Sequence, residues 1–180
     1  MSFSTETHPG VCAQPSTVSQ GFVLNHSMLR VKDPAVSLDF YTRLFGMRVL
    51  RKLDFPEMKF SLYFLHRPSE GDAPPPEEVG ERTAWTFSQH GLLELTHNWG
   101  TEADPAFKYH DGNAQPQGFG HICFSVPDLD AAIRWFDANQ VTYVKRPEQG
   151  KMKDVAFIKD PDGYWIEIVE PARLKTLGRA

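Results

Sequence analysis

The sequence predicts an α+β fold made of two tandem βαβββ modules, each curved into a partly open mixed barrel. The first observation behind this prediction is an internal repeat, in which a shift of 95 positions places His26 on His121, Val31 on Val126 and Asp33 on Asp128. The second is that strand-like and helix-like hydrophobic periods follow one another in the same order in both copies. A single module would leave one face of its sheet unburied, so two packed copies are expected.

The first copy begins with an apolar strand that leads through Asp33 into an amphipathic helix, and Pro34 suits the first turn of that helix. Three strand-like runs follow, the last being a hairpin of two short strands. The predicted elements are a strand at 28–31, a helix at 36–44, strands at 48–54 and 60–66, and a hairpin of Thr83–Phe87 with Leu92–Thr96.

The second copy repeats this order. Asp128 is placed to cap the helix, and Asp162-Gly163 is a strong tight-turn signal between the last two strands. The predicted elements are a strand at 122–126, a helix at 129–138, and strands at 141–145, 155–159 and 165–169.

Composition sets the boundaries of these modules. Residues 1–20 are rich in Ser, Thr and Pro without a period, which predicts a flexible leader. The first module is expected at 21–110, with a long surface loop at 67–82 that contains Pro74-Pro75-Pro76. The second module is expected at 111–171, followed by a tail at 172–180.

The bulk properties exclude several classes of function. A net charge of -4 offers no basic stripe for nucleic acid, and no apolar run is long enough to cross a membrane. Cys12 and Cys123 lie in unrelated contexts, which argues against a disulfide framework. The first 29 residues contain no Lys or Arg, unlike a signal or transit peptide. We therefore expect a protein of the reducing cytoplasm.

The repeat also pairs residues that carry chemistry. Each copy opens its first strand at a histidine, His26 or His121, and each places a glutamate in its last strand, Glu94 or Glu167. Two neutral imidazoles and two carboxylates would balance one divalent cation and leave coordination positions open. Taken singly, a strand glutamate is more often solvated or paired with a base, and a histidine is more often a satisfied core residue. Spacing alone leaves both interpretations open.

Several longer motifs resemble long-form glyoxalase I, a member of the vicinal-oxygen-chelate superfamily. They are His26 to Pro34 followed by Ser37 to Tyr41, Asp54-Phe55-Pro56 with Met58 to Leu65, Glu94 to Gly100, Gly118 to His121, and Asp160 to Glu167. The resemblance extends from about Gly21 to Pro171. The segments Lys59 to Leu65 and Glu94 to Gly100 are highly specific to the family.

The resemblance implies lactoylglutathione lyase chemistry, in which the hemithioacetal of methylglyoxal and glutathione becomes S-lactoylglutathione. It implies His26, Glu94, His121 and Glu167 as ligands of one divalent metal, with zinc favoured and nickel or cobalt as alternatives. At the first ligand position animal enzymes have Gln, where this chain has His26. The metal would stabilise an enediolate, Glu167 would act as general base, and Glu94 would serve the opposite substrate enantiomer.

The resemblance also implies the contacts with glutathione. Arg30 and Asn98 match positions that hold the γ-glutamyl end, while Lys145, Gly150 and Lys151 match the segment that holds the glycyl carboxylate. Gln117 stands where animal enzymes have Arg, so weaker γ-glutamyl binding is expected. The residues that resemble the apolar pocket for the small substrate side chain are Leu53, Phe55, Met58, Leu62, Phe64, Met152 and Phe157.

In the family the active site forms between the two subunits of a homodimer, with His26 and Glu94 from one chain and His121 and Glu167 from the other. The sequence does not distinguish this arrangement from pairing of the modules within one chain. Two other functions compete with this one. An iron dioxygenase would need two His and a single carboxylate, and a metal-free binding protein would need none of the four residues.

Overall fold

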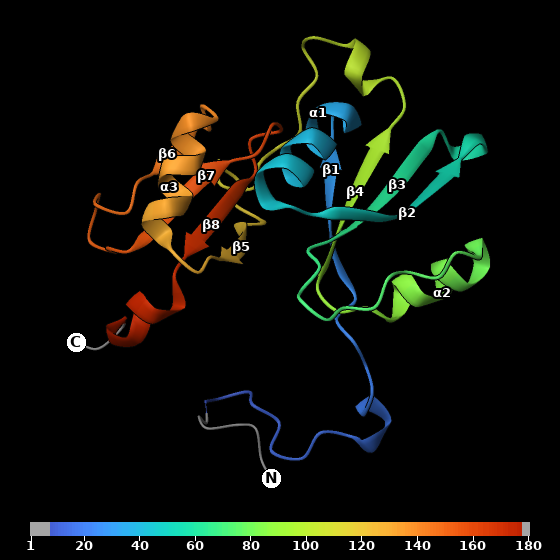
Figure 1. Cartoon of the computed structure of the whole chain (residues 1–180), viewed down its shortest axis with the longest axis horizontal. Helices are drawn as coiled ribbons and strands as arrows, with labels where there is room; N and C mark the ends of the chain where they lie inside the picture. Colours follow the sequence, from blue (N-terminus) through green and yellow to red (C-terminus); the bar gives the residue numbers. More distant parts are fainter. Residues whose placement is uncertain (1–7, 178–180) are drawn as a thin grey trace.

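The computed structural model describes residues 8–177 and contains two four-stranded mixed sheets with three α-helices (Figure 1). The predicted fold class is confirmed, because each module has the order βαβββ apart from one extra helix in the first. The first module comprises β1 His26–Val31, α1 Pro34–Asp39, β2 Arg48–Phe55, β3 Phe60–His66, α2 Val79–Ser88 and β4 Leu92–Asn98. The second comprises β5 His121–Ser125, α3 Leu129–Ala138, β6 Tyr143–Lys145, β7 Val155–Lys159 and β8 Trp165–Val169.

The two sheets have the same topology. Their strand orders are β1-β4-β3-β2 and β5-β8-β7-β6, and in each sheet the first strand runs parallel to the last while the other pairs are antiparallel. Strands β1 and β5 are therefore edge strands, and their free backbone groups remain available for pairing. The repeat seen in the sequence is thus a repeat of topology.

The helices begin where their caps predict. The Asp33 carboxylate accepts a hydrogen bond from the backbone N–H of Ala35 at 2.9 Å, and Asp128 accepts one from Ala131 at 2.8 Å. Helix α1 continues into a π-helical turn, Phe40–Leu44, so the predicted helix at 36–44 is present but changes geometry part-way.

One predicted element is wrong. Residues Thr83–Phe87 do not form a hairpin strand but belong to α2, and the surface loop predicted at 67–82 accordingly ends at Glu78, the N-cap of this helix. The Glu78 carboxylate caps this helix by accepting hydrogen bonds from Gly80 and Glu81. Trp85 packs against the buried side chains of Leu50, Phe64 and Leu92. The β-branched and aromatic residues of this segment favour a strand locally, and the burial of one helical face overrides that preference.

Each sheet has a core face and an opposite face. Strand residues alternate, so Leu29 and Val31 of β1 face the core while His26, Met28 and Arg30 lie on the other side. One apolar cluster joins the core faces of both modules. It includes Leu29, Val31, Phe40, Tyr41, Leu44, Leu93, Leu95, Phe136, Ile158, Ile166 and Ile168.

Polar contacts also join the two modules. The Tyr41 hydroxyl donates a buried hydrogen bond to Asp160 at 2.9 Å, and Asp162 accepts from the backbone N–H of Lys32 at 2.9 Å. The rings of Phe45 and Phe124 stack with centroids 4.3 Å apart. The two modules of one chain therefore pack through a specific interface. It is formed by the sheet faces opposite to those that carry His26 and His121.

The buried Asp160 should make the stability of this junction depend on pH. Burial raises the pKa of its carboxyl from 3.8 to about 7, although hydrogen bonds from Tyr41 and the backbone oppose this shift. Between these two pKa values the folded protein keeps Asp160 protonated, whereas the unfolded chain has lost this proton. The contribution of the protonated carboxyl to the stability of the fold is therefore fully present below the unfolded pKa and is lost as pH rises through the folded pKa.

Asp160→Asn remains neutral at every pH. The gap in free energy of unfolding between this variant and the wild type should therefore shift in favour of the variant by on the order of 1 kcal/mol as the pH rises from about 5.5 to about 8.5. Urea denaturation at the two pH values measures both differences. A gap that is independent of pH would show that Asp160 does not titrate in this range.

The segments outside the two modules contain little regular secondary structure. Residues 8–23 precede the first module and extend away from both sheets, with one 3-10 turn at Thr17–Ser19, whereas the carbonyls of Leu24 and Asn25 accept backbone hydrogen bonds from Gly91 and Leu92 (Figure 1). After β8, Pro171–Thr176 forms a 3-10 helix that begins at the last residue of the predicted second module and continues into the predicted tail. The predicted leader and tail also include residues 1–7 and 178–180, which lie outside the described part. None of the helices between residues 8 and 177 has the length and apolar character that a bilayer crossing requires.

Candidate metal centre and active site

The first module brings His26 and Glu94 together. Because β1 and β4 are parallel neighbours in which Met28 lies opposite Glu94, the imidazole two residues before Met28 shares a face with the carboxylate. His26 Nε2 lies 3.0 Å from Glu94 Oε2, and the Glu94 side chain is largely buried. The ring edges of Phe64 and Phe87 approach His26 with centroid distances of 5.4 and 6.2 Å.

The second module repeats this geometry. Cys123 lies opposite Glu167 between the parallel strands β5 and β8, and His121 Nε2 lies 3.3 Å from Glu167 Oε2. Phe157 of β7 lies opposite Glu167 on the other side and contacts the His121 ring at a centroid distance of 5.3 Å. Burial, followed by the hydrogen bond to Glu167 and the charge of that carboxylate, raises the pKa of the Cys123 thiol to about 11.

Further hydrogen bonds orient the first pair. The Asn25 amide donates to the backbone carbonyls of Thr86 and Gln89, which fixes its Oδ1 at 2.7 Å from His26 Nδ1. His26 Nδ1 is then the protonated nitrogen, and Nε2 keeps the lone pair that a metal ligand needs. Helix α2, which the sequence did not predict, thus supports this side of the site.

The four ligand-type residues do not form one cluster within a chain. Among residues 8–177, no group of three or more His, Cys, Asp or Glu side chains is placed to hold a metal ion. His26 and His121 nevertheless line the same groove of about 410 Å³, between the starts of β1 and β5. The donor set fits a divalent cation in charge and ligand type, but one chain presents it as two separate His–Glu halves.

The predicted γ-glutamyl contacts lie on the first module beside Glu94. Arg30 follows His26 and Met28 on the same face of β1, and Asn98 follows Glu94 and Thr96 on the same face of β4. The Asn98 amide donates to the Tyr109 hydroxyl at 3.1 Å. These side chains are thus oriented toward the same side as the carboxylate.

The predicted glycyl contacts lie on the second module. Gly150 and Lys151 belong to the connection between β6 and β7, and Gly150 has a positive φ of 68° that favours glycine. The Lys145 ammonium donates to the backbone carbonyls of Arg146 and Val155. Partial burial, with a smaller contribution from the charge of Lys153, lowers the Lys145 pKa.

The predicted apolar pocket is also divided between the modules. Phe55 and Leu62 lie on β2 and β3, where Phe55 stacks on Phe60 with a centroid distance of 4.7 Å. Met58 belongs to a 3-10 turn between these strands and is 62% exposed. Phe157 of β7 and the half-exposed Met152 belong to the second module.

Comparison with known proteins identifies the family. A sequence profile of the Glyoxalase/Bleomycin resistance protein/Dioxygenase superfamily matches residues 23–168, a span that contains both His–Glu pairs. The chain belongs to this superfamily.

Two curated relatives place this superfamily member more narrowly. A lactoylglutathione lyase of Pseudomonas aeruginosa is 55% identical over 179 residues, covering 99% of each chain. Glyoxalase I of Saccharomyces cerevisiae is 51% identical over 84% of this chain and 45% of its own length. The resemblance noted in the sequence is therefore confirmed.

Solved structures of glyoxalase I share the fold of this superfamily member. The enzyme of Leishmania major is 30% identical, with a TM-score of 0.58, over 87% of this chain and 98% of its own. The enzyme of Zea mays is 29% identical, with a TM-score of 0.59, over 82% of this chain and 44% of its own.

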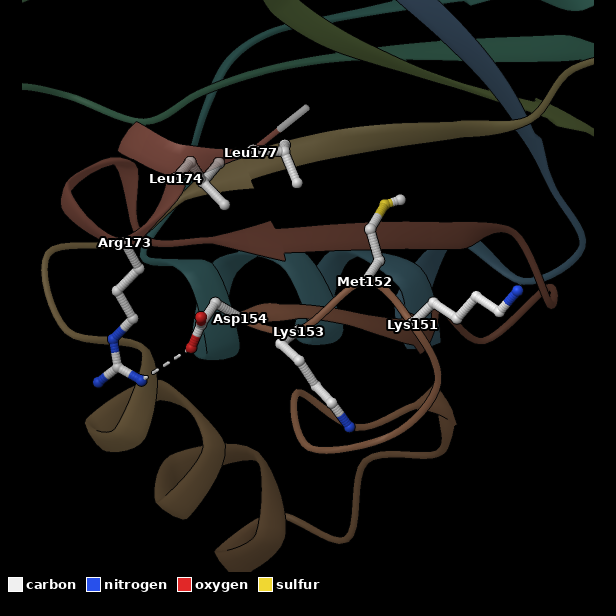
Figure 2. Close-up of a pocket in the computed structure, with 7 residues that line it drawn as sticks. All are labelled: Lys151, Met152, Lys153, Asp154, Arg173, Leu174 and Leu177. Atoms are coloured by element: carbon white, nitrogen blue, oxygen red, sulfur yellow. Dashed lines mark ion pairs between the residues drawn. The ribbon is translucent and has the colours of Figure 1, made fainter. Parts of the chain in front are cut away.

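The structure places further residues near the candidate site that the sequence analysis did not predict. Phe87 of α2 packs edge-on to Phe64, with centroids 5.0 Å apart, beside His26. Leu174 and Leu177 belong to the predicted tail, yet they line a cavity of about 510 Å³ together with Lys151 and Met152 (Figure 2). The ion pair of Arg173 with Asp154, at 3.6 Å, borders that cavity. Two leucines in an otherwise polar tail could have indicated from the sequence that this segment packs against the second module.

Proposed function

We propose that this protein is a lactoylglutathione lyase, which converts the hemithioacetal of methylglyoxal and glutathione to S-lactoylglutathione and so detoxifies methylglyoxal. The observation that carries the proposal is the repeated His–Glu pair, which has the same strand register and the same sheet face in both modules. Extensive identity to curated lactoylglutathione lyases supports the same conclusion.

The active site in this proposal needs two copies of the chain. Each copy offers one His–Glu half from β1 and β4 and another from β5 and β8, and the strands that bear the histidines are open edges. A homodimer would join the His26–Glu94 half of one protomer to the His121–Glu167 half of its partner, giving two equivalent sites.

One divalent metal would be held at each site by His26, Glu94, His121 and Glu167. We propose zinc, with nickel and cobalt as alternatives, because histidine at the first ligand position suits all three. When bound, the metal would supply Lewis-acid stabilisation of negative charge on the two neighbouring oxygens of the substrate.

The protein side chains would carry out the proton transfer. Glu167 would accept the proton from the substrate C–H bond and return it to the adjacent carbon, and Glu94 would be its counterpart for the opposite enantiomer. Arg30 and Asn98 would bind the γ-glutamyl end of glutathione. Lys145, Lys151 and the Gly150 backbone would bind the glycyl carboxylate, whose charge matches the two ammonium groups.

The apolar side chains would keep water from the reacting carbon atoms. Those proposed for the pocket are Phe55, Met58, Leu62, Met152 and Phe157, joined by Phe87 from α2. We also propose a reducing cytoplasmic compartment, since Cys12 and Cys123 are both free thiols.

A direct assay tests this proposal. Apoprotein prepared by chelation should regain formation of S-lactoylglutathione from premixed methylglyoxal and glutathione when Zn²⁺, Ni²⁺ or Co²⁺ is supplied separately. Activity that depends on one or more of these metals is the expected result. A metal-free protein with no turnover under any of them would instead support a binding function, and iron-dependent oxygen consumption would support a dioxygenase.

A further inference from the structure

Tyr109 lies in the connection between β4 and β5 and is held in place by packing. Its ring packs against the apolar cluster that joins the two modules, and Phe107 contacts it edge-on with centroids 4.9 Å apart. The Tyr109 hydroxyl accepts a hydrogen bond of 3.1 Å from the Asn98 amide at the end of β4. A hydroxyl on a packed ring has a fixed position, so it can determine the orientation of a neighbouring side chain.

This hydrogen bond determines which way the Asn98 amide is turned. The amide has a nitrogen that donates hydrogen bonds and an oxygen, Oδ1, that accepts them. Because the nitrogen faces the Tyr109 hydroxyl, Oδ1 faces away from it. Within residues 8–177 this oxygen accepts no hydrogen bond, so it is available to a donor on a bound molecule.

The Arg30 guanidinium lies in the same region as the Tyr109 hydroxyl, because both influence Tyr164. Burial raises the pKa of Tyr164 to about 12, neighbouring acidic groups that include Tyr109 contribute to this rise, and the positive charge of Arg30 opposes it. Arg30 lies opposite Thr96 in the register of β1 and β4, and Asn98 follows two residues later on the same face. A charged donor and an oriented acceptor are thus near each other.

The γ-glutamyl end of the proposed substrate carries two charged groups, an α-carboxylate and an α-ammonium. Arg30 can bind only the carboxylate, because a guanidinium has five donors and no acceptor. The ammonium group needs an acceptor, and the Asn98 Oδ1 atom is one on the same sheet face as Arg30. If the amide were turned the other way, its N–H groups would face the ammonium and no hydrogen bond would form.

We propose that Tyr109 is a positioning residue for recognition of the substrate amine. It turns the Asn98 amide so that Oδ1 accepts a hydrogen bond from the α-ammonium group of the γ-glutamyl end. The protein is then selective for thiols that carry a free α-ammonium group over thiols that lack it. This inference rests on the proposed function and deepens it, because it names the group of the co-substrate that is recognised.

Removal of the hydroxyl is the first test, since Tyr109→Phe leaves the Asn98 amide free to turn. The kcat/KM for the hemithioacetal of methylglyoxal and glutathione should fall about tenfold, through a higher KM and not through kcat. With glutaryl-cysteinylglycine, which is glutathione without its α-amino group, the loss should be at most about twofold. Equal effects on the two thiols would overturn the proposal.

Tyr63→Phe is a matched control, because it makes the same chemical change on the opposite face of the sheet. Tyr63 of β3 lies opposite the core residue Leu95, whereas its neighbour Phe64 lies opposite Glu94. The ratio of kcat/KM for the two thiols should be the same in Tyr63→Phe as in the wild type. A ratio that changes as much as in Tyr109→Phe would show that loss of any tyrosine hydroxyl is sufficient, and the proposal would fail.

A second substitution tests whether Tyr109 acts through Asn98. Asn98→Asp replaces the amide by a carboxylate, whose two oxygens both accept hydrogen bonds, so its orientation no longer matters. In an Asn98→Asp background, Tyr109→Phe should change the ratio of kcat/KM for the two thiols by less than about twofold. If Tyr109→Phe lowered this ratio about tenfold in both backgrounds, Tyr109 would act independently of Asn98 and the proposal would be wrong.

Calorimetry of ligand binding separates this inference from the proposed function. S-methylglutathione and its des-amino analogue can be titrated without turnover, and Tyr109→Phe should weaken binding of the first about tenfold and of the second at most about twofold. If the wild type is active and this difference in binding is absent, only the role of Tyr109 fails. If the wild type forms no S-lactoylglutathione with any metal, the proposed function fails, and the titration still decides whether Tyr109 selects the ammonium group.

Discussion

Replacing Glu167 with glutamine should lower kcat for S-lactoylglutathione formation about a thousandfold while the fold remains intact. Glutamine has the shape of glutamate but cannot accept the substrate proton near neutral pH. The side chain lies at the partly exposed end of the second His–Glu pair, so the substitution leaves no buried charge without a partner. The measurement is the initial rate of thioester formation, with circular dichroism and thermal unfolding to verify the fold.

Glu70→Gln is a suitable control, because Glu70 is an exposed residue of the loop before α2 and lies outside the proposed site. It makes the same chemical change and should leave kcat unchanged. Normal turnover in Glu167→Gln would remove Glu167 from the mechanism.

Two inactive variants should restore activity when their subunits are mixed. One variant combines His26→Ala with Glu94→Gln and loses the first-module half. The other combines His121→Ala with Glu167→Gln and loses the second-module half. If each site joins halves from two chains, random reassociation gives heterodimers with one intact site, and the mixture should recover about a quarter of wild-type activity.

The control for this experiment is each variant refolded alone, which should stay inactive. Recovery is measured after the two chains are denatured and refolded together in equal amounts. If both halves of a site came from the same chain, mixing would restore nothing. The experiment thus decides between the interface arrangement and the intra-chain arrangement that the sequence left open.

Local patterns were sufficient to predict most of the fold. The elements Phe60–His66, Leu129–Ala138, Val155–Lys159 and Trp165–Val169 have the predicted bounds, because alternation and helical spacing depend on residues only two to four apart. The prediction of a strand at Thr83–Phe87 was wrong because contacts distant in sequence determine the structure of this segment. Its strand-like composition was outweighed by packing of Trp85 against residues of three different strands, a contact that no local pattern encodes.

The candidate site was likewise predictable only in part. The repeat and the motifs selected His26, Glu94, His121 and Glu167, and strand alternation predicted which neighbours share a face with each glutamate. The supporting contact of Asn25 with α2 was not predictable, since it depends on where a helix distant in sequence packs.

The sequence by itself determined the duplicated βαβββ plan, the family, and the residues able to bind a metal, because these depend on residue type and short-range period. Only the tertiary structure decided that the described part of one chain presents two separate His–Glu halves, and that the Glu94 carboxylate accepts a buried hydrogen bond from Thr96. The reason is that the distance between side chains remote in sequence is set by strand register and module packing, which involve the whole chain at once.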